Sequence, residues 1–330
     1  MSRISEDMTL ADVGRLPGLE PLSDYLMECR ATSRDHIYST PLGSLRAWQG
    51  DAIVDAVMTG LRRLDEVVQA RPDTVIDIWS DSEKTEVAGR ARTKLVFFPG
   101  NIEAPFVMVT PGGGYNAVCS YLEGYPAAAR LNELGYNAFV LSYRTREDAS
   151  FPAPLEDLAR ALHYVLDHAR ELGTSRRYAL MGFSAGAHLA GTMATDAHGW
   201  HRWDLPRPDA MVLCYPALDL RTLAVTDADP IATEMLFSML GSDPTPDELA
   251  SWSVNVGAGP GFPPTYLWQC EDDDTVPYEN LRLMDAKLSE LDVPHEAITY
   301  ARGGHGLVKP HDIVADTWMD GVLAFLGRWL

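Results

Sequence analysis

Two patterns of apolar and polar residues divide the chain near residue 72. Before this point, apolar residues recur every three or four positions, as Ile53, Val57, Leu61 and Leu64 do, which is the spacing of one helix face. The polar sequence RPD then ends this stretch. We therefore expect residues 1–72 to form a helical extension packed on the main body. A role for it as a cap that walls a substrate pocket is left open.

After residue 72, short β-rich runs bounded by Gly, Pro or polar residues alternate with helical stretches, as in strands joined by tight connections. This alternation predicts an α/β domain with a mostly parallel sheet and helices on both faces. Ligands of such sheets bind at the carboxyl ends of the strands. Strands are expected at TVIDIW, KLVFF, FVMVTP, AFVLSY, YALMGF, AMVLCYP, PTYLWQC and EAITY, and helices at about 124–134, 154–172, after 184, 277–291 and 311–329.

One long stretch interrupts this alternation. Residues 217–263 are rich in Pro, Asp and Met and lie between two expected strands. We interpret them as a loop-rich, lid-like insertion that covers the pocket, and an ordinary surface excursion is the alternative. The predicted organisation is thus an extension over 1–72 and a catalytic domain over 73–330.

Charge and composition restrict the partners. The 27 basic and 47 acidic residues give a formal net charge of −20, which disfavours nucleic acid and anionic membrane as partners. The start, MSRISEDMTL, lacks the apolar core of a targeting signal, and no apolar run is as long as a membrane span. Four scattered cysteines in a large chain favour reduced thiols. A cytoplasmic protein is expected, and homo-oligomerisation is left open.

The segment YALMGFSAGAHLAG places Ser184 between Gly182 and Gly186, where an expected strand turns into a helix. Glycines on both sides relieve crowding in so sharp a turn, and the hydroxyl stands clear at the edge of the sheet. A helix N-cap serine with incidental glycines is the alternative. A reactive serine also needs a histidine base and a carboxylate that orients it.

His305 differs from the other histidines because it lies on the glycine loop RGGHG after an expected strand. His188, one helical turn after Ser184, is expected to pack or bond locally. Carboxylates are concentrated in CEDDDTVP, which follows another strand; a solvated loop or a metal site is the alternative, although no histidine or cysteine spacing nearby resembles a ligand set. The chain order Ser184, Asp273, His305 is the order expected of an α/β-hydrolase.

A third element is VTPGGGYNA, which offers three consecutive glycines after the strand FVMV. Glycine lets a backbone approach a ligand closely and present its N–H groups, as an oxyanion hole requires. The spacing of a phosphate-binding or dinucleotide-binding loop is missing. A tight structural turn is the alternative.

From about residue 93 onward the chain resembles the α/β-hydrolase superfamily. The resemblance rests on PGGGY, SYR, GFSAGAHLAG, FPPTYLWQCEDDDTVP and GGHG, and it is closest to bacterial esterases that include sugar acetyl-esterases and feruloyl- or xylan-esterase-like proteins. It implies the α/β-hydrolase fold. Pro111 stands where lipase-like relatives begin this loop with histidine, which favours the sugar-esterase branch. The implied site residues are Ser184 as nucleophile, His305 as general base, Asp273 as orienting acid with Asp272 and Asp219 as rivals, and Gly113, Gly114 and Ala185 as oxyanion-hole donors.

The resemblance implies a serine carboxylesterase for short-chain esters, acetyl esters above all, of carbohydrate alcohols. Its partner is a small-molecule ester substrate, and the chemistry requires neither a metal nor an organic cofactor. Tyr115, directly after the glycines, is expected to bind substrate by shortening the acyl pocket. Trp200 and Trp203 either stack on a sugar or pack in the fold. An amidase or peptidase on the same fold, or a catalytically silent binding protein, is the alternative.

Overall fold

A computed structural model describes residues 2–29, 31–224, 230–306 and 313–330. In these residues, eight strands form one sheet in the order β1-β2-β4-β3-β5-β6-β7-β8. Strand β2 pairs antiparallel with both of its neighbours, and the pairs from β4 to β8 are all parallel. The mostly parallel α/β sheet expected from the alternation is confirmed. The strands are β1 Val75–Ile76, β2 Lys94–Phe98, β3 Ala104–Thr110, β4 Asn137–Ser142, β5 Thr174–Phe183, β6 Ala210–Cys214, β7 Thr265–Cys270 and β8 His295–Tyr300.

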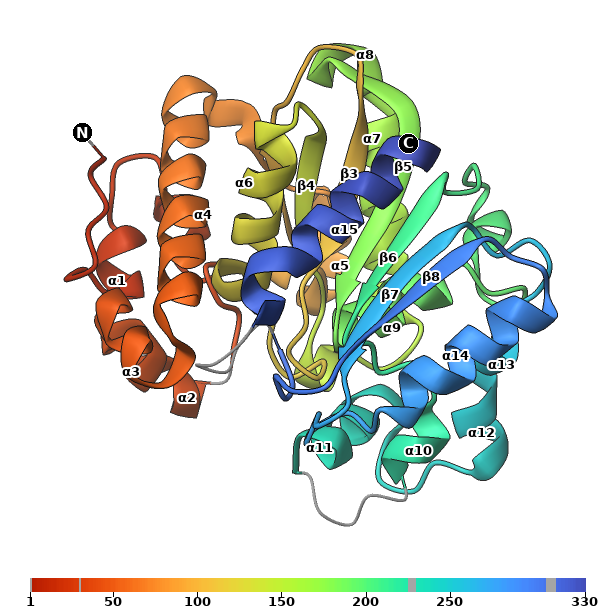
Figure 1. Ribbon diagram of the computed structural model, residues 1–330. Helices are drawn as coiled ribbons and strands as arrows, with labels where there is room; N and C mark the ends of the chain where they lie inside the picture. Colours follow the sequence, from red (N-terminus) through yellow and green to blue (C-terminus); the bar gives the residue numbers. More distant parts are fainter. Residues whose placement is uncertain (1, 30, 225–229, 307–312) are drawn as a thin grey trace.

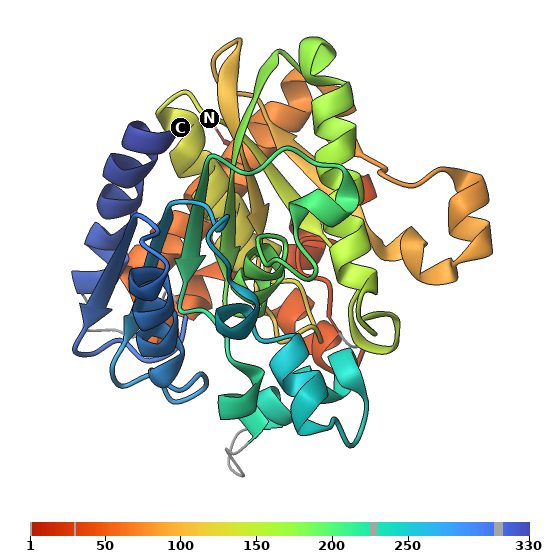
Figure 2. The same cartoon turned by 90° about the vertical axis from the view of Figure 1, so that its right-hand side faces the viewer.

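Helices cover both faces of this sheet (Figures 1 and 2). Successive residues of each strand point to opposite faces, so Leu180 joins one apolar core while Ala179 and Met181 join the other. The first core contains buried residues of α7, α9 and α14, and the second contains buried residues of α4, α6 and α15. The helices after β1 are α5 Asp81–Glu86, α6 Tyr125–Glu133, α7 Ala153–Asp167, α8 Ala169–Leu172, α9 Ala185–Thr192, α10 Leu220–Ala224, α11 Pro230–Leu240, α12 Pro246–Ser251, α13 Val254–Gly257, α14 Glu279–Glu290 and α15 Ile313–Trp329.

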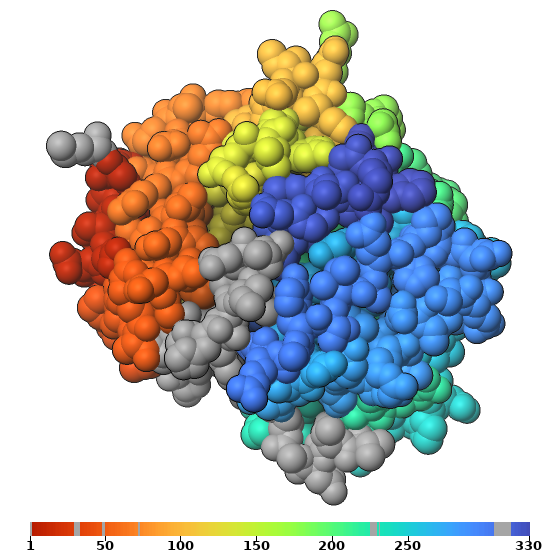
Figure 3. Space-filling model, viewed as in Figure 1, coloured from red at the N-terminus to blue at the C-terminus, as the bar shows by residue number. Residues whose placement is uncertain are grey.

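The N-terminal residues are helical and lie against the second core. Ile53, Val57, Leu61 and Leu64 are all buried, as their spacing predicted, and α4 packs against α6. Figure 3 shows these residues covering one side of the molecule beside α6. Their elements are α1 Leu10–Val13, α2 Ala31–Ser39, α3 Arg46–Gln49 and α4 Asp51–Ala70.

Short 3-10 and π turns complete the chain between these helices and strands. The 3-10 turns are η1 Glu20–Leu22, η2 Leu42–Leu45, η3 Pro72–Thr74, η4 Ala88–Arg92, η6 Arg146–Asp148 and η7 Trp200–Trp203, and the π turn is η5 Ser120–Gly124.

The interpretation of residues 217–263 as loop-rich was wrong. Four helices, α10 to α13, lie in this stretch, of which 225–229 are outside the described residues. Helix α12 shows why the prolines were misleading: Thr245 caps it, Pro246 is its first residue, and Glu248 completes a capping box. Proline at the first helical position starts a helix rather than breaking it.

Two further boundaries differ from the sequence analysis. Of the strand expected at TVIDIW, only Val75 and Ile76 pair with β2. The chain then leaves the sheet edge, where the Asp77 carboxylate forms ion pairs with Lys84 and Lys94. The helix expected over 154–172 is divided at His168, whose Nδ1 lies 2.8 Å from the Tyr164 carbonyl oxygen.

The four cysteines are free thiols, as their spacing led us to expect. Among the residues that the structure describes, no helix has both the length and the apolar character needed to cross a membrane. The cytoplasmic location stays a prediction.

Candidate active site

Ser184 lies in a sharp turn between β5 and α9, at the carboxyl edge of the sheet. Its backbone is left-handed, with φ of 51° and ψ of −119°, which is uncommon for a residue with a side chain. The two flanking glycines explain how the turn closes. A Cβ on Gly182 would lie 2.4 Å from the Gly186 carbonyl oxygen, and one on Gly186 would lie 2.0 Å from the Thr110 carbonyl oxygen. Only glycine fits at both positions, and the Ser184 hydroxyl is thereby held at the end of β5.

Loops after two other strands bring a histidine and a carboxylate to this hydroxyl. His305 Nε2 lies 2.9 Å from Ser184 Oγ, and His305 Nδ1 lies 2.9 Å from Asp273 Oδ2. Asp273 follows β7, and its side chain is completely buried, whereas the His305 side chain is 17% exposed. A carboxylate only accepts hydrogen bonds, so Nδ1 carries the proton and Nε2 of the neutral ring is free to accept the serine proton.

Further bonds fix Asp273 in place. Its Oδ1 accepts the backbone N–H groups of Thr275 and Val276 at 3.0 and 2.8 Å, and its Oδ2 accepts the amide of Gln269 at 3.0 Å. These donors come from the tight loop of the D-x-x-V-P sequence and from the end of β7. The carboxylate is therefore oriented before any substrate binds.

The two rival carboxylates have other contacts. Asp272 Oδ1 accepts the backbone N–H groups of Gly303 and Gly304 at 2.8 and 2.7 Å, and it thus secures the glycine loop that carries His305. Asp219 pairs with Arg221 and accepts the Asn255 amide at 2.9 Å. Burial alone would raise the pKa of Asp219, but the hydrogen bonds from Arg221 and Asn255 outweigh it and lower that pKa. Neither carboxylate is bonded to His305 in the described structure.

The glycine loop lies directly beside Ser184, because a Cβ on Gly112 would be 2.9 Å from Ser184 Cβ. Gly113 and Gly114 have left-handed φ values of 132° and 58°. The Gly113 carbonyl accepts the N–H groups of Asn116 and Ala117, both at 3.0 Å, which folds the loop back on itself. Within the described part of the chain, the N–H groups of Gly113, Gly114 and Ala185 have no backbone acceptor. Their role as an oxyanion hole stays a prediction.

Tyr115 is fully buried beneath this loop. Its ring packs edge-on against Tyr143 and Phe151, and its hydroxyl lies 2.9 Å from His188 Nδ1. On the other side of the His188 imidazole, Nε2 lies 2.8 Å from the Trp252 carbonyl oxygen, which only accepts hydrogen bonds. Burial lowers the pKa of His188 to about 4, so at neutral pH Nε2 donates and Nδ1 accepts the tyrosine proton. A contact between Tyr115 and substrate stays a prediction.

The tryptophans Trp200 and Trp203 do not support a sugar-stacking role. They lie in η7, which leads into the amino end of β6, at the sheet edge opposite Ser184. Both are partly buried against the first core, and Trp203 donates its indole N–H to the His198 carbonyl. Of the two alternatives, packing is the one that these contacts support.

Sequence reasoning missed a second pair of residues, Glu123 and Tyr215. Glu123 Oε2 accepts the Gly112 N–H, and its Oε1 accepts the Tyr215 hydroxyl at 2.8 Å. The Tyr215 ring lies edge-on to His305, with 5.1 Å between ring centroids, and its backbone is left-handed at φ 37°. Burial raises the pKa of Glu123, against the hydrogen bonds from Gly112 and Tyr215 and the nearby imidazole of His305. This pair connects the glycine loop to His305.

Neither residue was singled out in the sequence analysis. Tyr215 lies in the expected strand AMVLCYP, and Glu123 lies directly before the helix expected over about 124–134. Their contact joins positions 92 residues apart, which no local pattern indicates.

Among the described residues, no group of three or more His, Cys, Asp or Glu side chains could hold a metal ion.

A sheet of this order, with a serine in the turn after its central strand and a histidine at its carboxyl edge, defines an α/β-hydrolase. Residues 96–288 match the family model described as BD-FAE, and the chain belongs to this family. The resemblance identified from the motifs is thereby confirmed.

Similar proteins agree with this assignment. The chain is 32% identical over 295 residues to Endo-1,4-beta-xylanase B of Butyrivibrio fibrisolvens, covering 84% of this chain and 45% of that protein. It is 29% identical over 165 residues to an acetylxylan esterase of Xylanibacter ruminicola, covering 49% of this chain and 32% of that protein. This chain therefore spans less than half the length of these two relatives.

Among solved structures, the acetyl ester-xyloside bifunctional hydrolase from Caldicellulosiruptor lactoaceticus is 30% identical to this chain, with a TM-score of 0.62. The match covers 77% of this chain and 94% of that one. MGS-M1, an α/β hydrolase enzyme from a deep-sea metagenome library of the Medee basin, is 29% identical with a TM-score of 0.55, covering 72% of this chain and 92% of that one.

Proposed function

We propose that this chain is a serine carboxylesterase that hydrolyses short-chain esters, acetyl esters above all, of carbohydrate alcohols. The observation that carries the proposal is the hydrogen-bonded series Ser184, His305 and Asp273 at the carboxyl edge of the sheet. The names of two relatives, an acetylxylan esterase and an acetyl ester-xyloside hydrolase, support the choice of substrate class. A small-molecule ester is the partner that this site requires.

In the first half of the reaction, His305 Nε2 takes the proton of Ser184 as Oγ attacks the ester carbonyl. Asp273 holds Nδ1–H and stabilises the imidazolium that forms. In this proposal the N–H groups of Gly113, Gly114 and Ala185 stabilise the negative charge on the carbonyl oxygen, and the amino end of α9 adds its positive dipole. The alcohol leaves with the proton that His305 returns.

Water then attacks the acyl group on Ser184 by the same route. His305 takes the proton of the water, the second oxyanion forms in the same place, and the carboxylic acid is released as Ser184 regains its proton. Both halves use the His305 imidazole to move a proton from or to Ser184 Oγ, which already lies 2.9 Å from Nε2.

Replacing the serine tests the proposal directly. Ser184→Ala is expected to lower kcat for p-nitrophenyl acetate by about 10⁴-fold or more, because the attacking atom is gone. Ser82→Ala, at an exposed position on α5, is the matched control and should retain wild-type turnover. Equal hydrolysis by wild type and Ser184→Ala would contradict the proposal.

Acyl length and bond type sharpen the same test. We expect kcat/KM to fall from acetate to butyrate to octanoate esters of one alcohol, because Tyr115, which is buried directly after the glycines, is proposed to shorten the acyl pocket. A long pocket would instead gain about 0.8 kcal/mol for each added methylene. If kcat/KM for p-nitroacetanilide is comparable to that for the esters, the protein is an amidase. If the folded protein turns over none of these compounds, it is a catalytically silent binding protein.

A further inference from the structure

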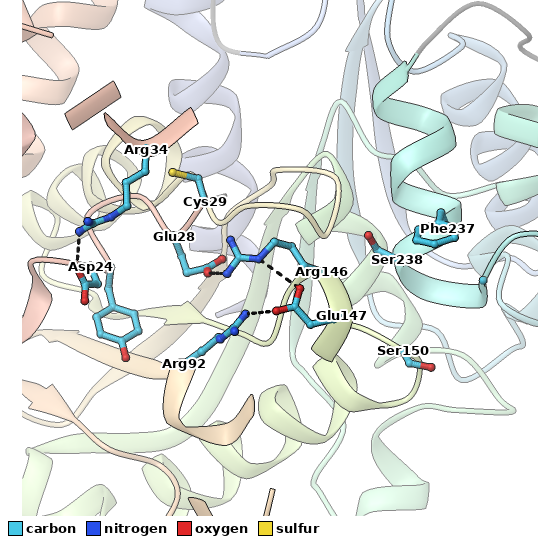
Figure 4. A pocket seen from close by; sticks show the side chains of 12 residues that line it. Asp24, Glu28, Cys29, Arg34, Arg92, Arg146, Glu147, Ser150, Phe237 and Ser238 are labelled. Carbon is cyan, nitrogen blue, oxygen red and sulfur yellow. Dashed lines mark hydrogen bonds and ion pairs between the residues drawn. The ribbon is translucent and has the colours of Figure 1, made fainter. Parts of the chain in front are cut away.

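A cavity of about 820 Å³ lies between the N-terminal residues and α11, which is within the usual range of small-molecule sites of ~300–1,000 Å³. Figure 4 shows Asp24, Glu28, Cys29 and Arg34 on one side, Phe237 and Ser238 on the other, and Arg146 between them. We call it the Arg146 cavity. Its lining residues are Asp24, Tyr25, Glu28, Cys29, Arg34, Arg92, Arg146, Glu147, Ser150, Phe237, Ser238 and Gly241.

The wall of this cavity is continuous with the glycine loop beside Ser184. The Arg146 backbone N–H donates to the Tyr115 carbonyl at 2.7 Å, and the Ser238 hydroxyl donates to Asn116 Oδ1 at 3.1 Å. The Glu28 carbonyl accepts the N–H of Val118 at 2.8 Å. A molecule in the cavity therefore lies against the outer side of the same loop whose start contacts the serine.

The charged groups of the cavity are paired with one another. Arg34 pairs with Asp24, Arg92 with Glu147, and Arg146 with Glu28. With three cations matched to three anions, the cavity has no surplus charge that would select an ion. Guanidinium groups only donate hydrogen bonds and carboxylates only accept them. Such alternating donors and acceptors suit hydroxyl groups, which do both.

Two aromatic side chains also line the cavity. The Phe237 side chain is 59% exposed on α11 and lines the cavity. Tyr25 is half-buried and also lines the cavity; its hydroxyl donates to the Ala91 carbonyl at 2.8 Å, and Lys94 Nζ lies 5.5 Å from its ring centroid. Aromatic faces beside paired polar groups bind the apolar C–H faces of sugar rings.

Arg146 has two features that point to a ligand. Its backbone is left-handed, at φ 58°, and such strain in a residue with a side chain concentrates at functional sites. Its Nη1 is buried and finds no hydrogen-bond partner among the residues described, although Nη2 is bound by Glu28. A buried donor without a partner carries a free-energy cost. The Arg146 side chain lines the cavity and is 14% exposed, so a turn of the guanidinium would bring this donor to a ligand oxygen.

We propose that the Arg146 cavity binds a neutral oligosaccharide, the carbohydrate part of the ester substrate, with Arg146 as a hydrogen-bond donor and Phe237 as a stacking surface. The inference rests on the proposed esterase activity. It assigns the N-terminal lining residues and α11 a shared role: both hold the alcohol side of the substrate, while the glycine loop holds its carbonyl.

Binding to an inactive variant tests the cavity separately from catalysis. Xylotetraose should bind Ser184→Ala in calorimetric titration, with little dependence on salt because the ligand is neutral. Tetragalacturonate is the charged comparison and should bind more weakly. No binding of xylotetraose, while wild type hydrolyses p-nitrophenyl acetate, overturns the inference and leaves the proposed function intact. If xylotetraose binds but wild type hydrolyses no ester, the proposed function fails and the binding inference stands. A salt-sensitive preference for tetragalacturonate would overturn the assignment of a neutral ligand.

The ratio of kcat/KM values for two substrates tests the role of Phe237. For each variant, kcat/KM for acetylated xylo-oligosaccharide is divided by kcat/KM for p-nitrophenyl acetate. Phe237→Ala should lower this ratio about tenfold, the size of a lost aromatic contact. Ile102→Ala removes another exposed apolar side chain, 87% exposed before β3 at the opposite sheet edge, and should leave the ratio unchanged. An unchanged ratio in Phe237→Ala overturns the stacking assignment.

Arg146→Lys tests the donor without removing the charge beside Glu28. Lysine keeps an ion pair but lacks the second nitrogen of the guanidinium fork. We expect KM for the acetylated oligosaccharide to rise severalfold with a smaller change in kcat, and the melting temperature to stay near that of wild type. A fall in kcat with constant KM would assign Arg146 to the support of the glycine loop instead.

Discussion

The Ser184 centre, meaning Ser184, His305 and Asp273, and the Arg146 cavity share the glycine loop but are built in opposite ways. In the centre, Asp273 is completely buried and is held by backbone donors and by Gln269. In the cavity, the pair of Arg34 and Asp24 is largely open to solvent, with side chains 36% and 70% exposed. The centre is fixed by buried bonds, whereas the cavity combines the buried pair of Arg146 and Glu28 with this exposed pair at its surface.

This difference predicts how each site responds to substitution. A buried hydrogen bond to a charged group contributes ~1.5–3 kcal/mol, and leaving its partner unpaired costs more. An exposed ion pair contributes ~0–1 kcal/mol. Substitutions in the centre should therefore affect kcat or the free energy of unfolding, whereas those in the cavity should affect mainly the choice of substrate. Four predictions test the contrast, from the largest expected effect to the smallest.

The largest effect is expected at the carboxylate. Asp273→Asn should lower kcat by about 10³–10⁴-fold, because an amide no longer fixes the proton on Nδ1 of His305. Asp272→Asn is the matched control: its carbonyl oxygen still accepts from Gly303 and Gly304, so a loss below about tenfold is expected. Steady-state kinetics with p-nitrophenyl acetate measure both. A severe loss in Asp219→Asn with little in Asp273→Asn would move the acid to the preceding strand.

The second prediction concerns pH and His188, which lies beneath the glycine loop. Its pKa is about 4 in the folded chain and 6.5 in the unfolded one, so only the unfolded state binds a proton between these values. Its contribution to stability is thus present above pH 6.5 and is lost as the pH falls toward 4, up to about 3 kcal/mol.

Urea unfolding at several pH values measures this effect. His188→Gln cannot take up the proton, so its free energy of unfolding should fall less steeply than that of wild type between pH 6.5 and 4. His36→Gln, at an exposed position, is the matched control. Equal slopes for wild type and His188→Gln would contradict a buried neutral imidazole.

A smaller effect on kcat is expected at Glu123. Glu123→Ala removes the acceptor for both the Gly112 N–H and the Tyr215 hydroxyl, and kcat should fall about 10- to 100-fold as the loop and His305 lose their alignment. KM for p-nitrophenyl acetate should change less. Glu123→Gln keeps one acceptor oxygen and should recover part of kcat. A loss of stability with wild-type kcat in the folded fraction would show that the pair is structural only.

The smallest effect is expected in the cavity. Asp24→Asn breaks the ion pair with Arg34 at the surface, and the free energy of unfolding should change by less than about 1 kcal/mol. Thermal unfolding at low and high salt measures it, and the small difference should shrink further with salt. A change as large as that of a buried pair would mean that the two sites are not built differently.

Much of the Ser184 centre was predictable because its parts carry local signals. The G-x-S-x-G motif itself indicates that a side chain at Gly182 or Gly186 would clash in the turn, and His305 lies on its own glycine loop. Choosing Asp273 over Asp272 needed the family pattern. The two carboxylates are adjacent in sequence, and only the folded loops show that Asp272 bonds to backbone while Asp273 reaches the imidazole.

The Arg146 cavity could not be predicted in this way. Glu28 meets Arg146 across 118 residues, and Phe237 comes from a stretch whose prolines resembled loop. Ion pairs between distant segments leave no periodicity in a sequence, and an exposed phenylalanine on a helix is visible only once the helix is placed. The same holds for Glu123 and Tyr215, which no motif connects.

The lack of room for a side chain at Gly182 and Gly186 has an evolutionary consequence. Any mutation at either glycine inserts a Cβ into backbone atoms about 2 Å away, so it removes the turn along with the activity. The serine between them is under no such constraint, since alanine fits the same left-handed turn. Descendants of this chain that abandon hydrolysis but keep binding carbohydrate should therefore lose Ser184 first and retain both glycines.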